Sequence, residues 1–147
     1  MRLRQLRLGE LSALVGAALV LLCTFEPSYH GPLGSPDAWH SFGAAVALML
    51  AAVCAALAMV SAALTERTAA LPVSTAVWCF ALGVAGSIAA IVRVLERPDH
   101  ATSVGVGGWL GLAGSLVILA GAFEVLRDER TSLYEPARPE PRARPGG

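Results

Sequence analysis

Long apolar runs fill most of the chain, and almost all charged residues lie between or beyond them. A helix needs about 20 consecutive, mostly apolar residues to cross the hydrocarbon core of a bilayer. The runs therefore predict four transmembrane helices, over residues 8–25, 42–64, 71–92 and 104–126. Glu10 and Glu124 are the only charged residues inside these ranges, and each lies close to an end.

Arginine residues give the predicted spans a direction, because cytoplasmic segments carry an excess of positive charge. With the N-terminus inside, nine arginines are cytoplasmic and only Arg93 and Arg97 lie outside. Short connections make neighbouring helices antiparallel. The expected fold is an all-α membrane protein, an up-down-up-down bundle of four transmembrane helices with both termini in the cytoplasm. No small-x-small cleavage site follows the first run, so we interpret that run as a span rather than a signal peptide.

Turn and cap residues mark the expected helix ends. Ser35-Pro36-Asp37 is typical of a helix start, with Ser35 as N-cap, proline in the first helical position and an acid in the first turn. Pro72 similarly begins the third helix, and Arg97-Pro98 ends it. Aromatic rings prefer headgroup depth, and those at the predicted outer interface are Tyr29, Trp39 and Trp109.

Residues 127–147 have a different composition, rich in proline and arginine. Such a segment cannot bury a core, and it is predicted to be a disordered cytoplasmic tail after a transmembrane domain of residues 1–126. Interspersed glutamates favour a solvated tail over contact of its arginines with anionic lipid.

Small residues recur along the last two spans at intervals that keep them on one helix face. Seven-residue spacing produces a nearly straight stripe and suits left-handed packing. The third and fourth spans are therefore expected to pack through their stripes. The stripe of the fourth span consists of Gly107, Gly114 and Gly121, supplemented by Gly111 and Ser115, and that of the third span of Ala76, Gly83 and Ala90, with Gly86.

Composition supports the membrane interpretation and argues against a nucleic-acid partner. Hydrophobic residues make up 55% of the 147 residues and charged residues only 15%, against about 25% charged in soluble domains. The formal net charge is zero, so a nucleic-acid partner is not expected. All eleven basic residues are arginine, a bias that indicates a GC-rich bacterial genome, such as that of an actinobacterium.

Catalytic and metal-binding patterns are sparse. Cys23, Cys54 and Cys79 form no CxxC motif and are interpreted as small buried hydrophobes. No two histidines have the helical spacing of a metal site, so His30, His40 and His100 are interpreted as solvated loop residues, with zinc or copper the less favoured alternative. Glu10 and Glu124 can pair with the nearby Arg7 and Arg127. The expectation is a protein without catalytic residues, metal or cofactor.

Arg93 is the most informative single residue, because it lies at the outer end of the third span with Glu96 one turn on. It could pair with Glu96 or with the first loop, or coordinate lipid headgroups, and an anchoring role is favoured over ligand binding. The candidate interaction cluster on the outer face comprises Tyr29, His30, Trp39, His40 and Arg93.

Several short motifs resemble a family of small uncharacterised four-helix membrane proteins of actinobacteria. They are residues 25–29 (FEPSY), Ala38-Trp39, residues 93–95 (RVL), residues 108–112 (GWLGL) and residues 127–130 (RDER). The family often has an aromatic residue where this chain has Ser28. The resemblance implies the four-span topology and carries no activity.

These observations favour a non-enzymatic structural, accessory or sensing component of the bacterial cell membrane, in contact with lipids and with another membrane protein or itself. The alternative is a subunit of a small oligomeric transporter or channel, which needs a polar path through the helices. A membrane enzyme that uses the outer histidines is the least favoured. The hydroxyl residues available for a path do not form one stripe: Ser12, Ser61, Ser74, Thr75, Ser87 and Ser115.

Overall fold

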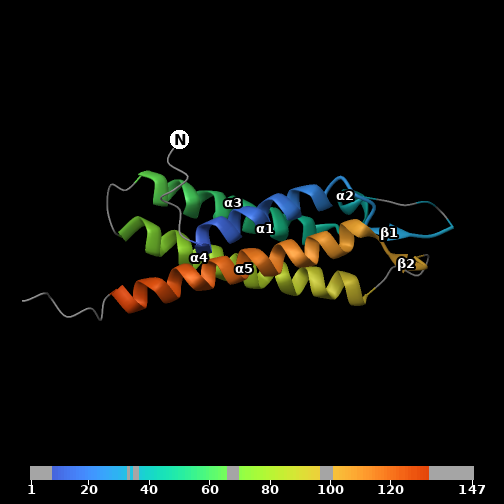
Figure 1. Cartoon of the computed structure of the whole chain (residues 1–147). Coiled ribbons are helices and arrows are strands. Elements are labelled where there is room, and N and C mark those ends of the chain that lie inside the picture. Colours follow the sequence, from blue (N-terminus) through green and yellow to red (C-terminus); the bar gives the residue numbers. More distant parts are fainter. Residues whose placement is uncertain (1–7, 33, 35–36, 66–69, 97–100, 133–147) are drawn as a thin grey trace, which may run out of the picture.

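The structure is a computed structural model that describes residues 8–32, 34, 37–65, 70–96 and 101–132. Within these ranges it has five helices and a two-stranded sheet (Figure 1). The long helices are α1 (Leu8–Cys23), α3 (Ala44–Thr65), α4 (Ala70–Leu95) and α5 (Val106–Ser132), and the short elements are β1 (Tyr29–His30), α2 (Ala38–Ser41) and β2 (Ser103–Val104). The chain is therefore mostly helical, as predicted.

Three of the described helices are long enough and apolar enough to cross a membrane: α3, Ser74–Leu95 of α4 and Val106–Asp128 of α5. These correspond to the second, third and fourth predicted spans, so the prediction of a multi-pass membrane protein is confirmed at this level. Helix α1 is apolar but has only 16 residues, which gives a length of about 24 Å at 1.5 Å per residue.

The four long helices lie side by side (Figure 1). Helix α5 packs against α1 and α4, and α3 packs against α4 and α1, so each long helix has two main neighbours. The short elements β1, α2 and β2 gather at one end, where α1 and α4 finish and α3 and α5 begin (Figure 1). We call this assembly, residues 24–43 and 101–105 as far as they are described, the cap.

The predicted packing of the third and fourth spans, α4 and α5, is confirmed. The glycine stripe of α5 faces α1, however, and does not meet the stripe of α4 as expected. A Cβ atom on Gly114 would lie 2.8 Å from the Gly16 carbonyl oxygen, and one on Gly121 would lie 2.5 Å from that of Gly9. Gly9 and Gly16 are also seven residues apart, so glycines on both helices let the backbones touch. The α4·α5 contact uses Gly83 instead, whose Cβ would lie 3.2 Å from the Cα of Leu119.

Helix boundaries also differ from expectation near the second span. Asp37, rather than Ser35, is the N-cap of α2, and Ser35 and Pro36 lie outside the described residues. Gly43 has a φ of +53°, a left-handed conformation that separates α2 from α3. At the other end of the chain, α5 continues to Ser132, beyond the expected boundary at 126. Residues 133–147 of the predicted tail lie outside the described residues.

The space between the helices is filled mainly by small side chains. Gly16, Ala17, Ala52, Ala56 and Ala76 are examples of buried positions. The larger buried side chains are Val20, Tyr29, Phe42, Met49, Met59 and Ile118. Cys23 and Cys79 are buried as predicted, whereas Cys54 is exposed on α3 and is an exception to that prediction.

Candidate functional site

The cap joins two loops that are distant in sequence. Strand β1 pairs antiparallel with β2, with Tyr29 opposite Val104 and His30 opposite Ser103. The carbonyl oxygen of His30 accepts hydrogen bonds from the Thr102 amide (2.8 Å) and the Thr102 hydroxyl (2.9 Å). The loop after α1 is thereby fixed to the segment that leads into α5.

Glycines at the start of α5 allow the first loop to lie directly on the helix. The Gly105 amide donates to the Ser28 carbonyl (2.8 Å), and the Gly107 amide donates to the Pro27 carbonyl (2.9 Å). A Cβ atom on Gly107 would lie 2.6 Å from the Glu26 carbonyl oxygen. The backbone of the loop therefore supplies acceptors to amides at the N-terminus of α5, which would otherwise lack helical partners.

Tyr29 is the central side chain of the cap. It is buried, and its ring lies 5.8 Å from that of Phe42 with an interplanar angle of 60°. Its hydroxyl donates a hydrogen bond to the backbone carbonyl of Arg93, in the last turn of α4. Burial raises the pKa of the Tyr29 hydroxyl, and the positive charge of Arg93 acts in the opposite direction. Tyr29 thus connects the first loop, α2 and α4.

Arg93 points toward the junction between α2 and α3. A Cβ atom on Gly43 would lie 3.5 Å from one guanidinium nitrogen of Arg93. The Arg93 side chain is partly buried, and Glu96 is exposed. The described residues form no ion pair between Arg93 and Glu96, so that suggestion from the sequence is wrong; the first loop meets Arg93 through Tyr29.

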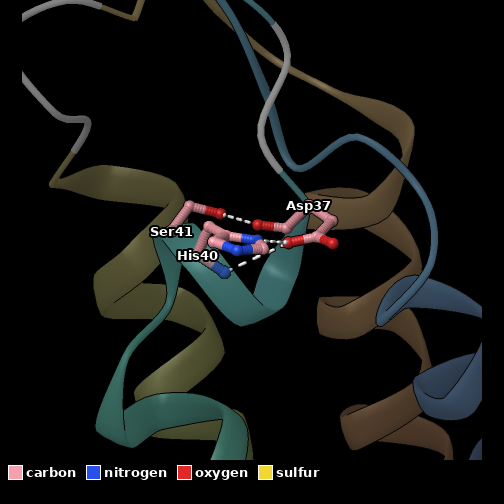
Figure 2. A network of polar contacts seen from close by, with 3 residues as sticks. All are labelled: Asp37, His40 and Ser41. Carbon is pink, nitrogen blue, oxygen red and sulfur yellow. Dashed lines mark hydrogen bonds and ion pairs between the residues drawn. The ribbon is translucent and has the colours of Figure 1, made fainter.

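A second polar group lies on the exposed side of the cap, around the start of α2 (Figure 2). One carboxylate oxygen of Asp37 accepts from the His40 amide (3.1 Å) and lies 2.6 Å from His40 Nδ1. The Ser41 hydroxyl donates to the Asp37 carbonyl. The hydrogen bond with the His40 side chain is the main reason that the pKa of Asp37 lies below its usual value.

The five residues of the candidate cluster share the cap but do not form one site. Tyr29 meets Arg93, whereas His40 pairs with Asp37 on the surface and has a side chain that is 80% exposed. Trp39 is 54% exposed. His30 takes part in the β-ladder and its residue is exposed. Within the part of the chain that the structure describes, no three His, Cys, Asp or Glu residues are placed to hold a metal ion; His100 lies outside it.

Sequence reasoning left Phe42, Gly43 and Asp37 out of the candidate cluster, and it assigned Asp37 only as an acid in the first turn of a helix. The three-residue spacing of Asp37 and His40 was an available signal, because it places a cap carboxylate next to a side chain in the first turn of a helix. Phe42 and Gly43 had no comparable signal, because both looked like the first residues of an apolar span.

Outside the cap, several described polar side chains bond to residues of their own helix. Glu124 and Arg127 form an exposed ion pair of 3.6 Å, as suggested by the sequence, while Arg7 lies outside the described residues. The buried Ser115 hydroxyl donates to the Gly111 carbonyl of its own helix (2.8 Å). Among the described residues, two buried hydroxyls lack a hydrogen-bond partner, those of Ser28 in the cap and Ser87 in α4.

Comparison with known proteins adds no relative: no model of a protein family, no curated protein and no solved structure matches this chain.

Proposed function

We propose that the protein is a four-span integral protein of the cell membrane, with both termini in the cytoplasm, and that it acts as a compact, non-enzymatic structural, accessory or sensing component. The observation that carries this proposal is the direct backbone contact between α1 and α5. Gly16 and Gly114 leave no room between these helices, since a Cβ atom on either would lie within 2.8 Å of the partner's carbonyl oxygen.

The remaining span of the four, the first in the chain, is α1 together with the residues that follow it. Gly9 lies against Val125, and Glu26 lies against Gly107. The segment from Gly9 to Glu26 therefore runs beside 18 helical steps of α5, roughly 27 Å at 1.5 Å per residue. A hydrocarbon core is about 30 Å thick. A helix that is short by itself thus accompanies α5 through nearly the whole bilayer, and the arginine distribution favours the cap on the outer side.

Close packing favours a structural or accessory role over a transporter. Helices in lipid associate through close contact rather than hydrophobic exclusion, and small residues permit that contact. A solute path would need polar groups that face one another across the interior. Ser115 bonds its own helix, and Ser61 is exposed and also bonds its own helix.

Membrane insertion and topology can be tested in cells with the full chain. After an alkaline wash, the protein should remain with the membrane fraction. A phosphatase fused after Gly147 should be inactive, and a phosphatase inserted at Gly34 in the cap should be active. Activity of the Gly147 fusion would contradict the orientation, and release by the alkaline wash would contradict the membrane assignment.

The accessory role and the transporter alternative have different outcomes. Co-purification of one stoichiometric partner from native membranes supports an accessory component. Solute flux in proteoliposomes that is lost in Ser87→Ala would contradict it, because Ser87 is the described α4 hydroxyl that is buried without a partner. Ser61→Ala is the control, since this exposed hydroxyl already donates to Ala58.

A further inference from the structure

Arg93 occupies a defined position at the cap end of α4. Its backbone carbonyl accepts the Tyr29 hydroxyl, so the last turn of α4 is tied to a buried side chain of the cap. The apolar part of α4 that can cross a membrane runs to Leu95, two residues beyond Arg93. A guanidinium at this depth lies where the hydrocarbon core gives way to headgroups.

The described protein supplies no carboxylate to this guanidinium. Asp37 is engaged by His40, and neither Glu26 nor Glu96 forms an ion pair with Arg93 among the described residues. One guanidinium nitrogen also lies beside Gly43, next to the first residue of α3. The start of a helix is its positive end, so this neighbour disfavours a cation rather than neutralising it. As far as the described residues go, this partly buried guanidinium is therefore available to an external anion.

Gly43 adds no side chain next to the Arg93 guanidinium. Gly43 is exposed and would place a Cβ atom only at ordinary contact distance from Arg93. Trp39, on the adjacent α2, is 54% exposed, as expected of an aromatic residue at headgroup depth. A planar guanidinium binds phosphate oxygens through two parallel hydrogen bonds, which a lysine cannot reproduce.

We propose that Arg93 binds the phosphate of a phospholipid headgroup in the leaflet next to the cap. This inference rests on the membrane placement given under Proposed function. A free phosphate ion has the same chemistry, and the lipid is favoured because the exposed Gly43 lies beside Arg93 at the end of a membrane-spanning helix. The bound lipid would neutralise Arg93 and anchor the cap end of α4.

The first test measures lipid binding to the purified full chain in a neutral detergent. Phosphatidylglycerol is titrated, and bound lipid is counted by native mass spectrometry. Arg93→Gln should weaken binding by about tenfold or more, the size of a lost charge-assisted contact. Arg127→Gln removes an arginine already paired with Glu124 and should change binding by no more than about twofold. Equal binding by the wild type and Arg93→Gln would overturn the proposal.

The second test changes the charge next to Arg93 without removing the arginine. Gly43→Asp places a carboxylate beside the guanidinium and should displace the lipid about as effectively as Arg93→Gln. Gly43→Asn is the matched control, because Asn and Asp tolerate a left-handed backbone similarly and differ here in charge. Equal lipid binding by the two Gly43 variants would overturn the proposal even if Arg93→Gln fails to fold.

Further measurements distinguish a lipid phosphate from a free phosphate ion, and failure of this inference from failure of the proposed function. Digalactosyldiacylglycerol, which lacks phosphate, should bind the wild type and Arg93→Gln equally. Displacement of phosphatidylglycerol by millimolar inorganic phosphate would reject the lipid in favour of the free ion. Release of the wild type from membranes by the alkaline wash would reject the proposed function, whereas retention with no effect of Arg93→Gln rejects this inference alone.

Discussion

Helices α1 and α5 meet through their backbones, whereas α3 and α4 leave space for a methyl group where they meet at Gly86. A Cβ atom on Gly16 would lie 2.6 Å from both the Gly114 carbonyl oxygen and the Ile118 amide nitrogen. At the α3·α4 contact, a Cβ atom on Gly86 would lie 3.6 Å from that of Ala52, an ordinary van der Waals distance. Glycine is therefore required in the first interface and replaceable in the second.

The closer of the two interfaces belongs to the shortest of the long helices. Helix α1 is the shortest of the four long helices, so it has the fewest residues with which to hold its place. Because lipid provides no hydrophobic drive between helices, contact at close range is the main source of association. The shortest helix accordingly makes the closest contact, through glycines on both sides.

The largest expected effect comes from filling this backbone contact. Gly114→Ala would place a methyl group 2.8 Å from the Gly16 carbonyl oxygen and the Val20 amide nitrogen. Neither backbone atom can move without displacing α1. We expect a loss of about 2–3 kcal/mol in the free energy of unfolding, the upper part of the usual range for overpacking a tight core. Reversible unfolding in mixed micelles with increasing dodecyl sulfate measures the change.

Gly86→Ala is the matched control, the same substitution in the α3·α4 interface. Its methyl group fits at normal contact distance, and alanine is the better helix former. The free energy of unfolding should change by less than about 1 kcal/mol. Equal destabilisation by Gly114→Ala and Gly86→Ala would show that the two interfaces do not differ as described.

The spans were largely predictable, because length and hydropathy are properties of the sequence itself. The partner of the glycine stripe was not, since spacing defines a face of a helix and not the helix that it meets. The structure identifies α1 as the partner, because Gly9 and Gly16 have the same seven-residue spacing as Gly114 and Gly121 and lie against them. The break at Gly43 was hidden for another reason: a single left-handed residue inside an apolar run leaves no periodic signal.

The cap was predictable by residue type but not by contact. Tyr29 and Arg93 were both selected from the sequence, yet they are 64 residues apart, and no local pattern indicates that they form a hydrogen bond. A contact between residues so far apart in sequence depends on how whole helices pack. The Asp37–His40 pair is local, and its spacing was sufficient to suggest it.

Removing the Tyr29 hydroxyl tests whether the cap is held separately from the helix interfaces. Tyr29→Phe keeps the ring contact with Phe42 and leaves the Arg93 carbonyl without its donor. We expect a loss of about 1–2 kcal/mol in the free energy of unfolding, because a partly buried acceptor loses its donor. Hydrogen exchange should accelerate in residues 27–43 and stay unchanged at the α1·α5 contact. Trp39→Phe, at an exposed position, is the control, and uniform acceleration along the whole chain would contradict a separate role for the cap.

The smallest expected effect is a dependence on pH confined to α2. His40 holds the pKa of Asp37 below its usual value of 3.8 in the folded protein, so this contribution is present above that value and is lost as the pH falls through the lower, folded pKa. Asp37→Asn keeps an acceptor for the His40 amide but not the charge. Between pH 5 and about pH 3, fluorescence of Trp39, with Trp78 and Trp109 replaced by phenylalanine, should report loosening of α2 in Asp37 chains and a flatter response in Asp37→Asn. Parallel curves would mean that the carboxylate contributes only as a cap, as asparagine does, and that the charge on the cap surface has no part in holding α2.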